Sequence, residues 1–130
     1  MSEKRISLTQ AEWSVMESLW DAGPLTGREV VQRMEQSCLW SRSTTLTLLS
    51  RLEAKGALES IPATKGPKVF SPLLKREDAA LEETKDFLNR VYQGSLSLMV
   101  SALTQKQALS REELDELYEL LKGLEEENHA

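Results

Sequence analysis

Hydroxyl-bearing and basic side chains recur at regular intervals between residues 40 and 56. Ser41 is a residue type that caps helices, and Leu48, Leu49 and Leu52 then fall on one helical stripe, with Thr45 beside them. At about 100° per residue, the opposite face carries small or hydroxyl-bearing residues, namely Ser43, Thr47, Ser50 and Ala54, with Leu46 on its flank. This face is free of acid, and basic residues surround it: Arg42, Arg51 and Lys55. Such a face can approach a polyanion closely, as a helix in a DNA major groove does. An ordinary amphipathic helix with a solvated polar face is the alternative, and this segment alone does not separate the two.

The charge of the chain is divided unevenly along its length. The net charge is −5 over 130 residues. Residues 1–72 carry 9 basic and 8 acidic side chains, a net of +1, and residues 73–130 carry 7 and 13, a net of −6. Because the acid is concentrated in the C-terminal part, the N-terminal part can still face phosphate.

Length and composition indicate a soluble globular protein of one or two small domains. No apolar run approaches the roughly 20 residues that cross a bilayer, and the N-terminus lacks the apolar stretch of a signal peptide. The single cysteine, Cys38, cannot form an internal disulfide, so we expect a cytoplasmic protein.

Three helix starts share the S/T-x-x-E pattern of a capping box. They begin at Thr9, Thr26 and Ser110, and each is preceded by a leucine and followed by an apolar residue at the fourth helical position. The first two introduce short helices, predicted at residues 10–21 and 27–36, with Trp13 and Trp20 in the core of the fold.

A third helix at residues 42–55 is followed by two predicted strands, at 57–61 and 68–71, around a turn that carries Pro62, Gly66 and Pro67. Three short helices followed by a hairpin constitute a winged helix-turn-helix, in which the third helix enters the major groove. Lys65 and Lys68 then lie near the tip of the wing, where phosphates would lie. We therefore predict a winged helix DNA-binding domain at residues 1–73, mainly α with a small β-hairpin.

Residues 74–130 contain three further amphipathic segments, predicted as helices at 75–92, 95–103 and 111–124, with a frayed tail after them. So few residues cannot bury these apolar faces alone, which implies a helical dimerisation region. The residues expected in the dimer interface are Leu81, Leu88, Val91, Leu114, Leu117, Leu121 and Leu124.

No set of side chains suggests catalysis, a metal or a cofactor. Cys38 is expected near a turn between helices, and the only histidine, His129, lies in the tail. A winged helix that binds only protein is the real alternative to DNA binding. We disfavour it because a protein-binding face would carry more apolar anchors.

Two motifs carry a family resemblance. Residues 11–20 read AEWSVMESLW, and residues 40–56 read WSRSTTLTLLSRLEAKG. They are similar to the AEWxVMxxLW and W-S-x-x-T-x-x-T-L-L-x-R-L-x-x-K-G runs of the penicillinase-repressor family, the BlaI/MecI/CopY group of bacterial regulators. The resemblance implies a homodimeric repressor that binds inverted-repeat operators in double-stranded DNA and is released by an inducing signal. DNA contacts are then expected from Arg42, Ser43, Thr44, Leu46, Thr47, Arg51, Lys55, Lys65 and Lys68.

The chain departs from this family pattern in three places. Penicillin-branch relatives carry basic residues at the positions of Ser43 and Leu46, so a different operator is expected. Their cleaved Asn-Phe pair, the target of a pathway that begins at a membrane sensor-protease, corresponds to Met99 and Val100. The C-x-C motifs of the copper branch are absent from the sequence. The resemblance implies a regulatory protease or sensor as a partner, and these departures predict an inducing signal other than that of either branch.

Overall fold

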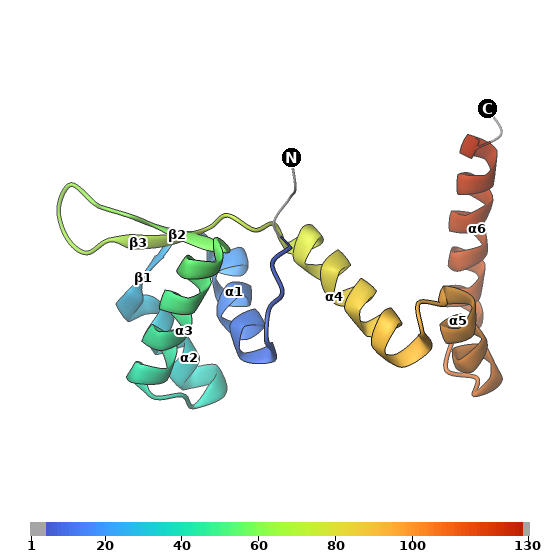
Figure 1. The fold of residues 1–130 in the computed structure, drawn as a ribbon, viewed down its shortest axis with the longest axis horizontal. Helices are drawn as coiled ribbons and strands as arrows, with labels where there is room; N and C mark the ends of the chain where they lie inside the picture. Colours follow the sequence, from blue (N-terminus) through green and yellow to red (C-terminus); the bar gives the residue numbers. More distant parts are fainter. Residues whose placement is uncertain (1–4, 129–130) are drawn as a thin grey trace. The chain divides into compact units, whose positions relative to one another are not determined.

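The computed structural model describes residues 5–128, which form six helices and a small sheet (Figure 1). They divide into two compact units at Lys85 and Asp86, within the helix α4. This packing boundary lies twelve residues beyond the predicted start of the dimerisation region at residue 74. The first turns of α4 therefore pack with the N-terminal unit, and a sequence pattern that changes at Leu74 does not reveal this.

Three capped helices form the body of the N-terminal unit. They are α1 (Gln10–Ala22), α2 (Gly27–Cys38) and α3 (Arg42–Lys55). Thr9 and Thr26 form the predicted capping boxes with Glu12 and Glu29. Helix α2 continues two residues beyond its predicted end, because the chain turns only at Leu39, which adopts a left-handed conformation with φ 59°. The predicted bounds of α3 are confirmed.

The wing is the hairpin of β2 (Leu58–Ile61) and β3 (Val69–Pro72), which pair antiparallel with Ser60 opposite Phe70. A third strand, β1 (Leu25–Thr26), pairs with the other side of β3, so the order is β1-β3-β2. Sequence reasoning missed β1, because two residues are too few to display the alternation of a strand. The predicted fold class, mainly α with a small β-hairpin, is confirmed.

The core lies between the three helices and the sheet. All three helices and the strands β2 and β3 contribute buried apolar side chains to it: Val15, Met16, Leu19, Val30, Met34, Leu48, Leu49, Leu52, Leu58 and Phe70. Trp13 and Trp20 were expected in this core but are only half-buried. Both indole N–H groups find acceptors at the edge of the core, Glu17 for Trp13 and the Leu74 carbonyl for Trp20. A half-buried position suits such a side chain, because its ring is apolar and its N–H needs a partner.

The remaining helices are α4 (Arg76–Tyr92), α5 (Leu96–Gln105) and α6 (Arg111–Asn128). Helix α6 includes Glu125 to Asn128, which we expected to fray; His129 lies outside the described residues. Ser110 supplies the cap, since its hydroxyl accepts from the Glu113 N–H at 3.1 Å. Among the described residues from Asp86 onward, no side chain is buried. Of the helices described, none is both long and apolar enough to span a membrane.

Candidate nucleic-acid interface

Helix α3 presents two chemically different faces. Thr45, Leu48, Leu49 and Leu52 are buried in the core, as predicted. The opposite face is exposed and carries Arg42, Ser43, Thr44, Thr47, Ser50 and Arg51. Leu46 is half-buried on the flank, as expected from its helical angle. The structure therefore brings the sequence-predicted reading residues of α3 to a single surface.

The start of α3 is held by hydroxyl groups. Ser41 Oγ accepts from the Thr44 N–H at 3.3 Å, as a helix cap does. The same oxygen lies 3.2 Å from Ser43 Oγ and 3.0 Å from Thr44 Oγ1. These hydroxyl groups can each donate or accept, so the first turn of α3 can hydrogen-bond to a phosphate or to a base edge.

A shallow hollow of about 280 Å³ lies along the outward face of α3. It is lined by Ser43, Thr44, Thr47, Leu48 and Arg51. Among the described residues that line this hollow, none carries a carboxylate and Arg51 alone is charged. A surface with these small side chains can lie close to another surface without steric conflict or anionic repulsion.

A second groove, of about 370 Å³, separates α3 from the wing and the start of α2. Its apolar wall includes Leu46, Leu49 and Phe70, and its basic residues are Arg28, Arg42 and Lys68. One acid, Glu53, also lines it, and this carboxylate accepts from the Ser60 hydroxyl at 2.7 Å. Three cations from three different elements thus converge beside the reading face.

Sequence reasoning missed Arg28. It is the second residue of α2, two positions after the Thr26 cap, and is exposed. The positive end of the helix dipole disfavours a cation at this position. A basic residue where an acid is preferred is the signal that could have identified it.

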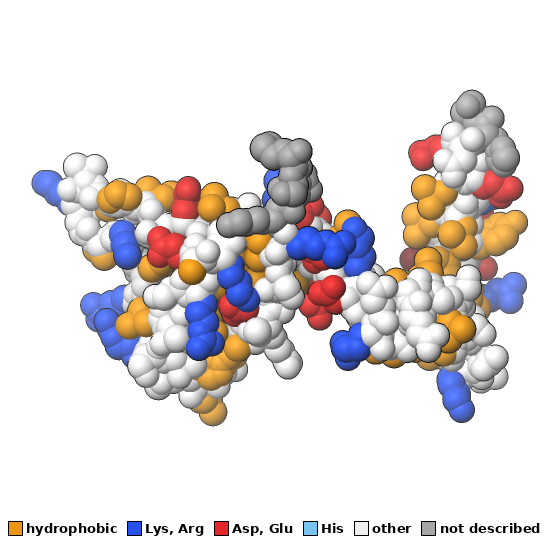
Figure 2. Space-filling model, in the orientation of Figure 1, with side chains coloured by type: hydrophobic (Ala, Val, Ile, Leu, Met, Phe, Trp, Pro, Cys, Tyr) orange, Lys and Arg blue, Asp and Glu red, His pale blue; other side chains and the backbone are white. Residues whose placement is uncertain are grey.

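The wing carries two exposed lysines, Lys65 in the turn and Lys68 next to β3. Lys68 Nζ lies 5.4 Å from the centre of the Phe70 ring, a cation–π distance, so the ammonium is directed back toward the groove. Figure 2 shows basic side chains at the tip of the hairpin and over the helices beneath it. These lysines lie where we predicted them.

Lys55 differs from the expectation of a phosphate contact. Its ammonium lies 2.5 Å from Glu12 Oε1 and 2.9 Å from the Ser7 carbonyl oxygen, at the end of α3 that meets the start of α1. Glu12 is 2 % exposed. Burial raises the pKa of Glu12, but hydrogen bonds from Lys55 and Thr9 outweigh it and hold the pKa below its ordinary value. A buried carboxylate requires this cation, so Lys55 serves the fold.

The residues predicted for the dimer interface remain uncovered in the single chain. Leu81, Val91, Leu114, Leu121 and Leu124 are exposed, and Leu88 and Leu117 are half-buried. Further apolar side chains are exposed nearby in sequence, including Phe87, Leu96, Leu98, Tyr118 and Leu120. Met99 and Val100, at the expected cleavage position, lie within α5 and are half-buried.

The arrangement of α2, α3 and the hairpin defines a winged helix-turn-helix protein. The penicillinase repressor profile matches residues 8–123, and the chain belongs to this family. It is 33 % identical over 114 residues to a penicillinase repressor of Bacillus licheniformis, covering 88 % of each chain. It is 29 % identical over 123 residues to the methicillin resistance regulatory protein MecI of Mammaliicoccus sciuri, covering 93 % of this chain and 98 % of MecI.

Two solved structures have a similar winged-helix unit. One is the B. licheniformis BlaI monomeric form in complex with the blaP half-operator, with a TM-score of 0.52 and 28 % identity. The match covers 60 % of this chain and 93 % of that one. The other is the DNA-binding domain of the repressor BlaI, with a TM-score of 0.52 and 30 % identity, covering 58 % and 93 %.

Proposed function

We propose that this chain is a homodimeric transcriptional repressor that binds inverted-repeat operator DNA through α3 and the wing. The observation that carries the proposal is the exposed face of α3, which has no carboxylate between Arg42 and Arg51 and is bordered by cations from α2, α3 and the wing. The similarity to a BlaI structure in complex with a half-operator supports the same use of this face.

Ser43, Leu46 and Thr47 would read bases. Their side chains are too short for the bidentate hydrogen bonds that Arg makes to guanine or Asn and Gln make to adenine. Methyl groups can instead pack against the thymine methyl, and hydroxyls can bond to either type of pair. We therefore expect a preference for adenine–thymine pairs opposite the first turns of α3.

Arg28, Arg42, Arg51, Lys65 and Lys68 would contact phosphates on both sides of the reading face. Each neutralised phosphate releases condensed counterions, so binding should weaken steeply with salt. These contacts position the protein but carry little sequence information. Replacing any one of them should weaken binding to all sequences alike. The slope of the logarithm of the binding constant against the logarithm of the salt concentration should fall in magnitude by about one unit.

The C-terminal helices would form the dimer. None of the described side chains from Asp86 onward is buried, and several of those left exposed are leucines. Apolar surface of this extent is unfavourable in water and calls for a partner. A second copy is the economical partner, because helix-turn-helix dimers read two half-sites related by the same symmetry.

Release from DNA would follow from a signal that acts on the C-terminal region. Binding of two half-sites by a linked pair gains from effective concentration, so loss of the dimer weakens operator binding without any change in α3. A cytoplasmic repressor of this kind would have a regulatory protease or sensor as a further partner.

Selection of bound sequences from random duplex DNA tests the proposal. We expect an inverted repeat with adenine–thymine pairs in each half. Thr47→Glu should abolish the enrichment, because its carboxylate would face the phosphates of the groove, while Ser37→Glu at the exposed end of α2 provides a control for added charge. No enrichment by the wild-type dimer, or equal enrichment by Thr47→Glu, would overturn the proposal and favour a protein-binding winged helix.

A further inference from the structure

The start of α4 is attached to the winged-helix core at several points. The Leu73 and Leu74 N–H groups both donate to the Ala57 carbonyl oxygen, at 2.9 and 3.0 Å. The Leu74 carbonyl in turn accepts from Trp20 Nε1 at 2.8 Å. Ala79, one turn into α4, is 3 % exposed. The chain therefore enters α4 along a path fixed by the backbone of its neighbours.

Arg76, the first residue of α4, is held by three side chains of α1. Its Nη2 donates to Glu17 Oε1 at 2.7 Å, and its guanidinium carbon lies 5.7 and 5.8 Å from the ring centres of Trp13 and Trp20. Trp13 Nε1 donates to the same Glu17 oxygen at 2.8 Å. The two indoles meet edge to face, with their ring centres 5.2 Å apart.

The geometry of this cluster restricts the orientation of α4 more than it stabilises the fold. The Arg76 and Glu17 side chains are 50 % and 41 % exposed, and ion pairs at such exposure contribute little to stability. A planar guanidinium over two rings and one carboxylate nevertheless has few alternative positions. The cluster is therefore suited to orienting the helix.

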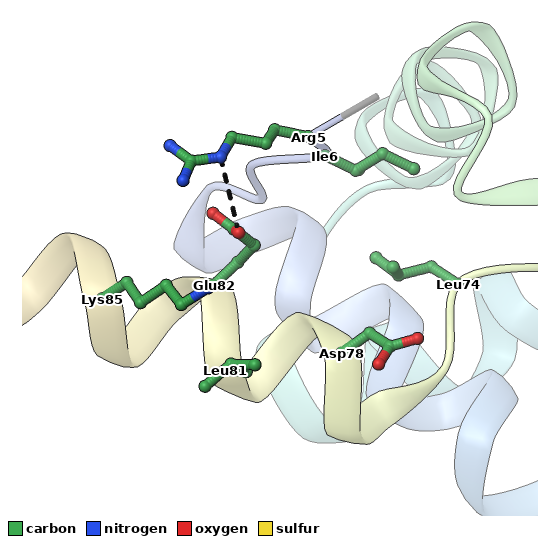
Figure 3. Close-up of a pocket in the computed structure, with 7 residues that line it drawn as sticks. All are labelled: Arg5, Ile6, Leu74, Asp78, Leu81, Glu82 and Lys85. Carbon is green, nitrogen blue, oxygen red and sulfur yellow. Dashed lines mark ion pairs between the residues drawn. The ribbon is translucent and has the colours of Figure 1, made fainter. Parts of the chain in front are cut away.

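A second contact crosses to α4 from the N-terminal segment. In Figure 3, Arg5 extends toward Glu82, with Arg5 Nε 3.7 Å from Glu82 Oε1. The pocket beside them, about 570 Å³, is lined by Ile6, Leu74 and Leu81 and by two acids and two bases. Its charges balance and Arg5 is 75 % exposed, so this contact restrains α4 only weakly. Arg76 is the stronger restraint.

We propose that Arg76 is a positioning residue that sets the spacing between the two half-sites the dimer accepts. The inference rests on the proposed function. Helix α4 continues without a break from Arg76 to Tyr92 and carries Leu81, Leu88 and Val91, the residues proposed for the dimer interface. The orientation of α4 at its first residue would therefore set the distance between the two α3 helices of the proposed dimer.

A small change in this orientation is enough to alter the spacing. With 17 residues at 1.5 Å per residue, α4 is roughly 25 Å long. A tilt of about 10° at Arg76 moves the far end by about 4 Å, which exceeds the roughly 3.4 Å rise of one base pair. A restraint on α4 at Arg76 would therefore be sufficient to distinguish neighbouring spacings.

The test measures the affinity of the full-length dimer for duplexes that carry two selected half-sites at a series of spacings, and for a duplex with one half-site. We expect the affinity of the wild-type protein for one spacing to exceed its affinity for the others by about tenfold or more. Binding of the second half-site by an already bound dimer raises the affinity by at least that factor when the geometry fits. Arg76→Ala should reduce this preference to about threefold or less. Its affinity for the single half-site and its dimer content should be unchanged.

Three further variants keep the test decisive. Arg76→Lys keeps the charge but loses the planar group, and Glu17→Gln keeps the side-chain shape, so both should lose spacing preference without unfolding. Arg90→Ala removes the arginine that lies over Phe87, 5.8 Å from its ring centre, later in the same helix, and should behave as wild type.

The inference would be overturned if Arg76→Ala kept the wild-type preference for one half-site spacing. If Arg76→Ala does not fold, the same result in both Arg76→Lys and Glu17→Gln would overturn it. A fall in half-site affinity that parallels a fall in the unfolding midpoint would also overturn it, by indicating a purely structural role. Failure of the wild-type protein to bind any duplex would instead refute the proposed function.

Discussion

Lys55 Nζ lies 2.5 Å from Glu12 Oε1, and this ion pair joins the end of the reading helix to the first turn of α1. The carboxylate is almost fully buried, whereas the lysine side chain is 36 % exposed. Because Glu12 also accepts from the Thr9 N–H, one side chain connects a helix cap and the C-terminus of α3. The position of α3, the proposed DNA-reading helix, is thus tied to Glu12, a residue of the first motif in the chain.

Lys55→Ala should destabilise the fold by about 2 kcal/mol, because it leaves a buried carboxylate without its cation and the partly exposed lysine moderates the loss. The salt slope of operator binding should remain unchanged. Arg51→Ala, four residues earlier and exposed on the reading face, should behave oppositely, with little change in stability and a slope lower by about one unit. Urea unfolding and binding across a salt series measure both quantities. A normal stability with a reduced slope in Lys55→Ala would restore its role as a phosphate contact.

The same pair predicts how stability depends on pH. The pKa of Glu12 is lower in the folded chain than its ordinary value of 4.5, so ionised Glu12 stabilises the fold. That contribution is complete above the ordinary value and is lost as the pH falls through the lowered folded value. We expect the free energy of unfolding of the wild type to fall in this acid range. The double variant Glu12→Gln, Lys55→Met should lack this part of the decline. If the free energy of unfolding falls equally in both proteins as the pH is lowered, other groups cause the decline.

Thr45 gives an opportunity to stabilise the reading helix. Its side chain is fully buried, and its Oγ1 has no hydrogen-bond partner among the described residues. Thr45→Val keeps the branched shape and removes the buried hydroxyl, so the free energy of unfolding should rise by about 1 kcal/mol. Thr47→Val, two residues later on the exposed face, should leave stability unchanged and alter operator binding instead. Destabilisation by Thr45→Val in urea unfolding would mean that the hydroxyl has a partner in solution.

Local signals predicted most of the winged-helix unit. Helix α3 begins and ends at the predicted residues because Ser41 and Gly56 supply strong cap chemistry within the segment itself. The hairpin follows from turn residues between two apolar runs. These features depend on neighbours in sequence, and sequence reasoning can evaluate them directly.

Features that depend on distant residues were missed. The burial of Glu12 and the direction of Lys55 arise from a contact across 43 positions, and neither residue type indicates it. The attachment of α4 to α1 through Arg76 spans 59 positions. Arg28 was overlooked because its importance comes from the groove that it shares with Arg42 and Lys68. Periodicity assigns a face to each residue but does not say which faces meet.

Leu117→Asp should convert the proposed dimer to monomers. Leu117 lies on the stripe of α6 leucines proposed for the interface, and the symmetric dimer would bury the new charge twice. At roughly 1.4 kcal/mol per tenfold, a cost of about 3 kcal/mol raises the dissociation constant by about 100-fold. Gly123→Asp adds the same charge on another face of α6, where a Cβ atom would meet nothing within 4 Å, and should remain dimeric. Sedimentation velocity measures both, and a dimeric Leu117→Asp would move the interface elsewhere.

Proteolytic release from the operator would require access to α5. Met99 and Val100, the pair expected at the family's cleavage position, lie inside α5, where the Met99 N–H donates to the Ser95 carbonyl oxygen at 3.3 Å. A protease requires an extended strand, so α5 must open locally before the chain can be cut. A cut between Met99 and Val100 would separate the rest of α5 and all of α6 from the winged-helix unit. Each proposed interface leucine lost would remove about 1.5–3 kcal/mol of apolar burial, enough to dissociate the dimer.

Because Met-Val differs from the Asn-Phe pair of the penicillin branch, we expect this chain to resist the β-lactam-induced protease of that branch. Co-expression with a β-lactam sensor, followed by mass spectrometry after drug exposure, should yield the intact chain. The double variant Met99→Asn, Val100→Phe restores the family's pair in the same helix and should yield a fragment that ends at residue 99. Cleavage of the wild type at Met99 would refute the expected resistance. An intact double variant would mean that access to α5, and not the identity of the two residues, prevents the cut.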